Sequence, residues 1–255
     1  ATSRRVMGPS FDYNANDATR SRRDYTYLPN GQLGKIVSRS VSGAAYNTTI
    51  RYDHAGLPVT MSSGNDSYEL FWDEQSRLID MVVTKQPIIN TGIFTVRWHY
   101  HYLGTTLLAA TREVEQGTYD ISGAYTKVWT VKRFWVIADE RGLPHRMLDE
   151  QGAEYWRATW DAAGWRTIST QAADMQVWFG LPGQLLLPYT DAYTSGLVGG
   201  VTKTWYRAPI ALNQWRAYDA LTGMYLQPDD ADRIGRTDPE GYAYARSSPV
   251  GLSDK

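Results

Sequence analysis

The sequence contains no cysteine, which excludes disulfide bonds, thiolate nucleophiles and cysteine-ligated metal sites. It also lacks any run of the roughly 18 to 20 consecutive apolar residues that a membrane-spanning helix needs. Net charge is nearly absent as well, because 26 basic residues stand against 27 acidic ones, a formal balance of −1. A chain this close to neutrality does not concentrate nucleic acid or anionic lipid around itself. No nucleic-acid partner and no membrane span are therefore expected.

Aromatic residues are abundant, with ten Trp, eighteen Tyr and five Phe against only six Met. Broad rings pack well on the pleated, half-buried surface of a sheet and are less suited to helices. Hydrophobic residues make up 42% of the chain, which is enough apolar material to build a core. The composition predicts an all-β fold.

One pattern recurs along the chain: an aromatic residue, then Asp, two variable residues, a small turn-forming residue and an apolar-rich run. The clearest copies begin at Tyr52-Asp53, Trp72-Asp73 and Trp160-Asp161. Two weaker copies keep part of it, one with Asp139 and Gly142 but no ring, the other with Tyr27 and Asn30-Gly31 but no Asp. Asp53 and Asp73 are 20 residues apart, and Asp139 and Asp161 are 22 apart.

Each part of the pattern suits a β-hairpin. Strand-forming residues precede the Asp, the Asp side chain accepts hydrogen bonds from nearby backbone amides, and Gly adopts positive φ at little steric cost. A period of about 20 residues gives one hairpin per repeat. Because an isolated hairpin is only marginally stable, neighbouring hairpins are expected to stack edge to edge into an extended, curling sheet.

These repeats resemble the tyrosine-aspartate (YD) repeats of the Rhs, teneurin and Tc-toxin C-subunit families, and the last third of the chain strengthens the likeness. Residues 179–184 (FGLPGQ) resemble the step that opens the Rhs core, and residues 241–250 (GYAYARSSPV) resemble the step that precedes its end. Between them, a stretch resembles the core's arginine- and tyrosine-containing segment at Arg216, Tyr218, Asp219, Thr222, Gly223, Leu226 and Asp229.

The resemblance implies a β-sheet shell whose end is plugged by the core segment. It divides the chain into a YD hairpin array at 1–178, with a divergent insertion at 84–131, and an Rhs-core-like segment at 179–255. Alternating residues between Phe94 and Tyr102 still predict strands within that insertion. The chain is short for a closed shell, so we expect a C-terminal piece of a larger protein or a small member that needs a partner.

The resemblance also implies self-cleavage, in which two aspartates and an arginine cut the backbone near the core's end. By position these are Arg216, Asp229 and Asp254. Two carboxyl groups brought close cannot both ionise, so one would act as general acid and the other as general base. Asp230 and Lys255 stand where the family has proline. Any enzymatic activity is expected to be this aspartyl autoproteolysis at most, with no metabolic reaction.

Two other features are candidates for chemistry. His99 and His101 share one face of a strand at a spacing that zinc sites use, but no third ligand lies nearby in sequence. The glycine-rich residues 195–200 lack the Lys-Ser/Thr ending of a phosphate loop and are expected to form a loop. The sequence therefore predicts no metal and no cofactor.

The function predicted is that of a shell component of an Rhs or Tc-like polymorphic toxin, which encloses or docks a C-terminal cargo. Its partners would be other parts of a larger shell, or a second shell chain, and the toxin cargo polypeptide. Delivery would be by secretion or a bacterial export system. The alternative from the residues is an extracellular module that binds glycans or proteins through exposed aromatics, which compete with simple cross-strand packing as the role of these rings.

Overall fold

The computed structural model describes residues 22–39, 45–85, 94–119, 125–161, 164, 166–172, 175–180, 184–188, 194–198, 201–205, 210–213, 216–220 and 224–227. Within these ranges every regular element is a strand, so the predicted all-β class is confirmed. None of these residues belongs to a helix that is long and apolar enough to cross a membrane.

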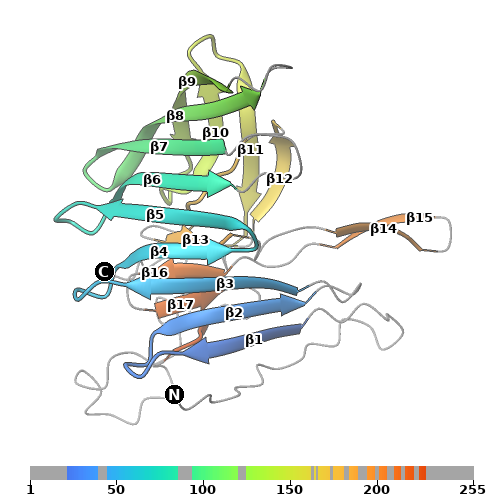
Figure 1. The fold of residues 1–255 in the computed structure, drawn as a ribbon. Helices are drawn as coiled ribbons and strands as arrows, with labels where there is room; N and C mark the ends of the chain where they lie inside the picture. Colours follow the sequence, from blue (N-terminus) through green and yellow to red (C-terminus); the bar gives the residue numbers. More distant parts are fainter. Residues whose placement is uncertain are drawn as a thin grey trace.

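Twelve antiparallel strands form one continuous sheet, and their spatial order is the order of the sequence (Figure 1). The sheet is open, because β1 and β12 lie at its two edges and do not pair with each other. The strands are β1 (Arg22–Tyr27), β2 (Leu33–Arg39), β3 (Ala45–Tyr52), β4 (Pro58–Ser63), β5 (Asp66–Trp72), β6 (Leu78–Lys85), β7 (Phe94–Leu103), β8 (Thr106–Tyr119), β9 (Tyr125–Ala138), β10 (Pro144–Asp149), β11 (Glu154–Trp160) and β12 (Arg166–Gln171).

Residues of the predicted insertion take part in this sheet. β7 pairs with β6, and β8 pairs with β7 and β9, without a change in strand order. The predicted insertion thus continues the sheet in sequence order after β6. The division of the chain at residue 178 into an array and a core segment stays a prediction.

The sheet has one buried and one exposed face because apolar residues alternate with polar ones along its strands. In β5, Tyr68 and Leu70 are 1% and 3% exposed, whereas Glu69 and Phe71 between and beside them are exposed. β7 repeats the pattern with Trp98 and Tyr100 buried and Arg97 exposed. Figure 1 shows this sheet bending around, so that β10 to β12 turn away from the plane of β1 to β6.

A small second sheet consists of β13 (Gln184–Leu186), β16 (Ile210–Asn213), β17 (Arg216–Asp219) and β18 (Met224–Tyr225). Figure 1 shows β13, β16 and β17 behind β3 and β4. Leu185, Ile210 and Ala217 of this sheet share one buried cluster with Leu33 and Ile50 of the large sheet. We call the four strands, together with residues 175–180, the plug.

The plug also contacts the far end of the large sheet. Leu186, Tyr218 and Tyr225 of the plug form a second buried cluster with Leu143, which lies between β9 and β10, and the ring of Trp160 at the end of β11 packs against it. One face of the plug thus lies in the core shared with β2 to β11, and the other packs on Leu143 and Trp160 at the β10–β11 end. The extended, curled sheet of antiparallel strands confirms the predicted all-β architecture.

A separate hairpin consists of β14 (Thr194–Val198) and β15 (Val201–Trp205), which pair only with each other. Figure 1 shows it extending away from both sheets. The glycine-rich residues 195–200 were predicted to be a loop, and that prediction was wrong for 195–198, which lie in β14. Leu197 and Val198 supply the strand-forming character that the neighbouring glycines obscured in the sequence.

Candidate functional site

Of the three predicted catalytic residues, Arg216 lies in the described part of the chain. It opens β17, where it pairs with Asn213 of β16, and its guanidinium carbon lies 3.6 Å from the ring centroid of Tyr225. Asn213 Nδ2 donates a hydrogen bond of 2.7 Å to the same tyrosine's hydroxyl. Asp229 and Asp254 lie outside the described residues, so a meeting of these carboxyls with Arg216 stays a prediction.

Hydrogen bonds join β17 to the residues that follow β18, and join these residues to β1. The amide of Ala217 donates to Gln227 Oε1 at 2.7 Å, and the amide of Leu226 donates to the Ala217 carbonyl at 2.7 Å. Tyr27 Oη, from the edge strand β1, donates to the Leu226 carbonyl at 3.2 Å. Asp219, which closes β17, is only 6% exposed. The chain that leads toward Asp229 is therefore held against the first strand of the large sheet.

The aspartates of the repeat form turns of one kind. Asp139 Oδ1 accepts hydrogen bonds from the amides of Arg141 and Leu143, at 3.0 Å each. Two backbone hydrogen bonds close the same turn. The Asp139 amide donates to the Leu143 carbonyl, and the Gly142 amide donates to the Asp139 carbonyl. The residue three positions after the aspartate has positive φ, as in a type I turn followed by a bulge. These left-handed residues are Gly31, Gly56, Ser76, Gly142, Gly152 and Gly164.

Two members of this set depart from the sequence pattern. In the first hairpin Leu28 occupies the Asp position, and its amide and carbonyl still bond Gln32 and Gly31. Asp149 forms a turn that the sequence analysis did not predict; its Oδ1 accepts hydrogen bonds from the amides of Gln151 and Ala153. The spacing between Asp149 and Gly152 was the signal that could have found it.

Ser76 stands at the left-handed position with a φ of 58°, where the other hairpins have glycine. A side chain costs energy in this conformation, while glycine costs unfolded-state entropy. We therefore expect Ser76→Gly to raise the free energy of unfolding by about 0.5–1 kcal/mol. Urea denaturation measures the change, with Ser76→Ala as the matched control that should give no gain. Equal midpoints for all three proteins would contradict the assignment of strain to Ser76.

The carboxylate of Asp73 accepts several hydrogen bonds within its turn. Burial acts to raise the pKa of Asp73, but hydrogen bonds from the amide and side chain of Arg77 and from the amide of Gln75 outweigh it, so the pKa lies below its ordinary value. Arg77 Nε donates to Asp73 Oδ2 at 2.7 Å. A carboxyl with a lowered folded-state pKa stabilises the fold above its unfolded-state pKa and loses that contribution as pH falls through the folded one.

We therefore expect the protein to lose stability as the pH falls below about 4, the ordinary range of an Asp pKa. Asp73→Asn keeps an acceptor oxygen but removes the titrating group, so its decline below this pH should be shallower. Thermal unfolding followed by circular dichroism at several pH values between neutrality and strong acid measures both profiles. Parallel profiles would mean that Asp73 contributes nothing to acid sensitivity.

Successive turns at one rim of the sheet are bonded to each other. Before four of the turns, an aromatic ring reaches back to the previous hairpin and donates a hydrogen bond to a backbone carbonyl there. These bonds are Tyr52 Oη to Leu33 at 2.8 Å, Trp72 Nε1 to Pro58 at 2.6 Å, Tyr102 Oη to Leu78 at 3.0 Å and Trp160 Nε1 to Pro144 at 2.7 Å. The aromatic residue of the repeat is thus the link between hairpins.

Side chains at the turns reach in the opposite direction, toward the next turn. Gln32 Nε2 donates to the Gly56 carbonyl at 3.1 Å, and Arg141 Nη1 donates to the Asp161 carbonyl at 3.0 Å. Arg77 donates from Nη1 to the Gly104 carbonyl in the same manner. We call these bonds and those of the rings the turn ladder. It accounts physically for why ring, acid and glycine recur together.

The two histidines weighed as ligands lie on the exposed face of β7. His99 Nδ1 is 2.5 Å from Asp80 Oδ1 and its Nε2 is 3.8 Å from Glu113 Oε2. His101 instead bonds the Thr111 hydroxyl at 3.3 Å. Among the described residues, no group of three or more His, Asp or Glu side chains is arranged to hold a metal ion.

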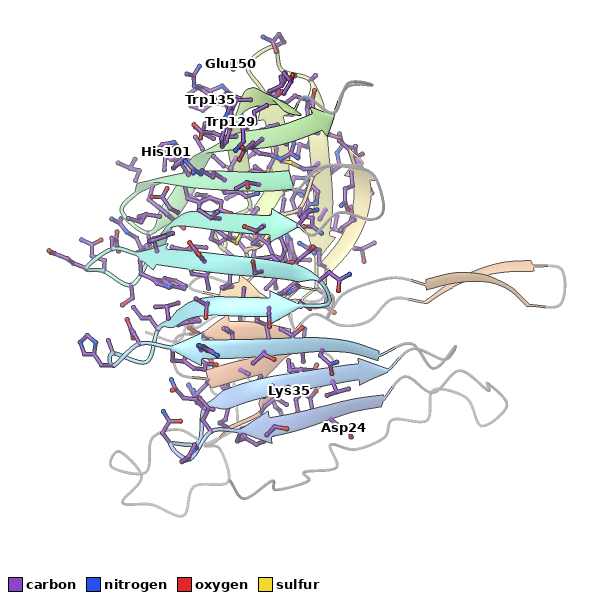
Figure 2. All side chains as sticks on the ribbon, in the orientation of Figure 1. Asp24, Lys35, His101, Trp129, Trp135 and Glu150 are labelled. Atoms are coloured by element: carbon purple, nitrogen blue, oxygen red, sulfur yellow. The ribbon has the colours of Figure 1, made fainter. Side chains whose placement is uncertain are left out.

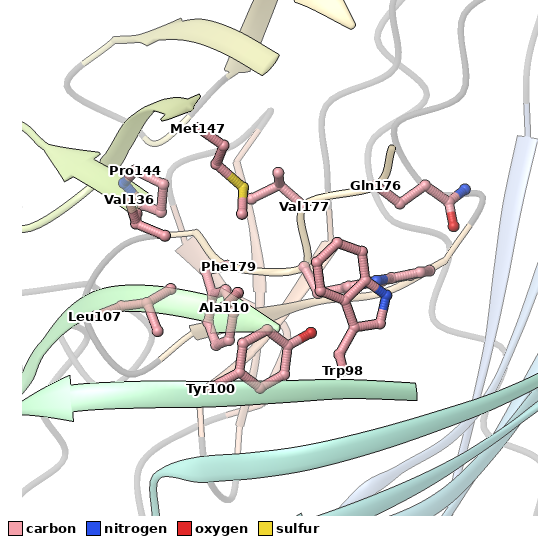
Figure 3. A pocket seen from close by; sticks show the side chains of 11 residues that line it. Trp98, Tyr100, Leu107, Ala110, Val136, Pro144, Met147, Gln176, Val177 and Phe179 are labelled. Carbon is pink, nitrogen blue, oxygen red and sulfur yellow. The ribbon is translucent and has the colours of Figure 1, made fainter. Parts of the chain in front are cut away.

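A narrow gap lies between β7 to β10 and residues 176–179 of the plug (Figure 3). Its volume is only about 10 Å³, roughly the room of one water molecule. Trp98, Tyr100 and Phe179 line it, and the rings of Tyr100 and Phe179 meet edge to face at 4.7 Å. Burial first, and then Tyr102 and Asp80, raise the pKa of Tyr100. The gap marks the packing of plug on sheet and has no room for a small-molecule substrate.

Comparisons with known proteins found fold-level likeness alone. No family model matches the chain, and no curated protein matches it. Among solved structures, a Tc holotoxin pore from Photorhabdus luminescens is 16% identical with a TM-score of 0.34, and a TcdB2–TccC3 complex is 15% identical with a TM-score of 0.42. Each match covers 92% of this chain, which spans only 13% and 14% of the two toxin chains.

A third similar structure is a porin-like protein from Bacteroides uniformis, at 10% identity and a TM-score of 0.28, with 76% of this chain and 91% of that chain covered. With identities and TM-scores this low, the likenesses define neither a family nor a function. The function is therefore argued from the residues of the chain itself.

Proposed function

We propose that the chain is part of the wall and plug of a hollow protein shell of the Rhs or Tc-like toxin kind. The observation that carries this proposal is the plug's position, with one face buried in the core of β2 to β11 and the other packed on Leu143 and Trp160 at the β10–β11 end of the same sheet. A sheet of hairpins in sequence order grows by simple addition at its edges. Further hairpins beyond β1 would extend the wall in the same way.

The cargo of such a shell would be a polypeptide held unfolded or partly folded on the concave side. The turn ladder supports a role as a rigid wall, because it fixes each hairpin to its neighbours by side-chain bonds in addition to the strand pairing. Other parts of a larger shell, or a second shell chain, would complete the enclosure. Secretion or a bacterial export system would deliver it.

Self-cleavage by Arg216, Asp229 and Asp254 belongs to this proposal as a separate step. A protonated carboxyl would donate to the departing amide nitrogen while an ionised one takes a proton from the attacking water, so that one peptide bond is hydrolysed. The position of Arg216 on the strand that leads toward Asp229 is compatible with this role. Its guanidinium would stabilise the negative charge that develops on the carbonyl oxygen.

Protease protection tests the shell. The natural protein that contains these residues, expressed from its complete reading frame, is digested with proteinase K, and the fragments are identified by mass spectrometry. We expect the polypeptide that follows the plug to survive while the sheet is folded and to be digested once urea has unfolded the sheet. Circular dichroism reports the folding state, and the same polypeptide expressed alone is the control. Digestion at the same rate with and without the folded sheet would overturn the proposal.

Intact-mass measurement tests self-cleavage in the same complete protein. We expect a cut wild type and an uncut Asp229→Asn variant, with Asp230→Asn as the neighbouring control that is still cut. A wild type that stays whole, or an Asp229→Asn variant that is cut equally, would end this part of the proposal. Either result leaves the protection experiment unaffected.

A second candidate is an extracellular module that binds glycans through exposed aromatic rings. Trp135 favours it, since this side chain is 61% exposed on the outer face of β9, near His101 (Figure 2). CH groups of sugars pack on such rings. A glycan array probed with the wild type and with Trp135→Ser separates the candidates, because only a glycan-binding module would lose signal with the ring.

A further inference from the structure

Two rings that line the gap between the large sheet and the plug carry polar atoms that bond no other described residue. Tyr100 belongs to β7 and Trp178 to the plug, and both line the gap. No atom in the described part of the chain forms a hydrogen bond with Tyr100 Oη or Trp178 Nε1. The rings of the turn ladder differ, since each donates to a backbone carbonyl, as Tyr102 Oη does to Leu78 at 3.0 Å.

Both polar atoms are shielded from bulk solvent. Tyr100 is 6% exposed and Trp178 is 5% exposed, and each of the two atoms has almost no exposed surface. A buried donor without a partner is costly, so buried polar groups are nearly always hydrogen-bonded, either to protein or to an ordered water. In Figure 3 the hydroxyl oxygen of Tyr100 points away from Leu107 and toward the side of the gap where Trp98 lies. The hydroxyl is thus placed to bond a molecule in the gap.

Size and charge select that molecule. The volume of about 10 Å³ is close to the least that admits one water molecule, and it excludes anything larger. The lining residues include no Asp, Glu, Lys, Arg or His, so an ion would lack a countercharge. An apolar occupant would leave both polar atoms unbonded. Water fits the volume, carries no charge, and both donates and accepts hydrogen bonds.

The bonding capacities of the two rings also fit water. The Trp178 indole only donates, whereas a tyrosine hydroxyl donates or accepts. Burial raises the pKa of Tyr100, so its hydroxyl keeps its proton. A water between them accepts from the indole and donates to the hydroxyl oxygen. Met147 brings a thioether sulfur, which is a weak acceptor, to the same gap. A buried water usually has two to four such partners.

We propose that one water molecule is bound in the gap between Tyr100 Oη of the large sheet and Trp178 Nε1 of the plug. Rings pack around this site, with Tyr100 and Phe179 at 4.7 Å and Tyr68 and Trp178 at 5.4 Å between centroids. The site forms only where residues 175–180 lie against β7, so the water is a bond between plug and sheet. It does not depend on whether the sheet encloses a cargo.

Oxygen-17 magnetic relaxation dispersion of the full chain tests this site. The method counts water molecules that the protein holds far longer than those at its surface, and it does not detect hydroxyl protons. Tyr100→Phe keeps the ring and removes the hydroxyl, so we expect it to lose one long-lived water relative to the wild type. Tyr102→Phe is the matched control, because it removes a hydroxyl of the same strand that already bonds the Leu78 carbonyl, and it should lose none.

A double variant shows whether the two rings share one molecule. Trp178→Phe removes the indole donor and is also expected to lose one long-lived water. Tyr100→Phe combined with Trp178→Phe should lose no more than either single variant, because both groups hold the same water. An unchanged count in Tyr100→Phe, an equal loss in Tyr102→Phe, or a loss of two waters in the double variant would each overturn the proposal. Circular dichroism of each variant checks that the sheet is folded.

Discussion

Trp156→Ala is expected to lower the free energy of unfolding by about 3–5 kcal/mol, the range for removing a fully buried tryptophan. Trp156 is 0% exposed on the concave face of β11, and the guanidinium carbon of Arg166 lies 5.9 Å from its ring centroid. Arg166 in turn donates from Nη1 to the Val177 carbonyl of the plug at 2.7 Å. The substitution therefore opens a cavity at the place where sheet and plug meet.

Urea denaturation followed by far-ultraviolet circular dichroism measures this loss without depending on tryptophan fluorescence. Trp135→Ala is the matched control, since it removes the same ring from an exposed site and should cost less than about 1 kcal/mol. Equal losses in the two variants would mean that the β11 end of the sheet does not pack on the plug.

Asp139→Ala should cost about 2–3 kcal/mol, because hydrogen bonds to a charged acceptor contribute more than neutral ones. Asp139 Oδ1 accepts two backbone amides, and its Oδ2 accepts Arg141 Nε at 3.1 Å and Nη2 at 2.9 Å. Without the carboxylate, Arg141 also loses the partner that aims it at the Asp161 carbonyl. The variant thus weakens its own turn and the rung of the turn ladder beyond it.

Asp139→Asn separates the two contributions. Its amide oxygen still accepts the backbone amides of the turn, so most of the stability should remain while the ion pair with Arg141 is lost. Thermal unfolding of wild type, Asp139→Asn and Asp139→Ala should give melting temperatures in that descending order. An alanine variant as stable as the asparagine variant would show that the side-chain bonds to the turn amides contribute nothing.

Much of the fold followed from local chemistry. The turns at Asp53, Asp73, Asp139 and Asp161 were predictable because each needs only a few consecutive residues, and all of them carry the expected backbone bond. The turn at Leu28 was found through Asn30-Gly31 in spite of its missing acid. Asp149 was missed although its spacing to Gly152 is the same as that of Asp139 to Gly142, a copy that also lacks the ring.

Contacts between residues far apart in the sequence could not be predicted from the sequence alone. The bond from Trp72 Nε1 to the Pro58 carbonyl depends on the register between two hairpins, which local pattern does not specify. The ring of Tyr225 beside Arg216 depends on the pairing of β17 with β18. The short length of β10, which pairs only with residues 134–138 of β9, is set by the turn at Asp149 that the prediction had missed.

Strand order in the large sheet has a consequence for how the protein is made. Every strand from β2 to β11 pairs with its two neighbours in sequence, so the sheet contains no crossover. A chain of this kind acquires its contacts locally, and each hairpin is able to add to the one before it as soon as it leaves the ribosome. The plug, whose partners lie far back in the sequence, docks last and completes the core.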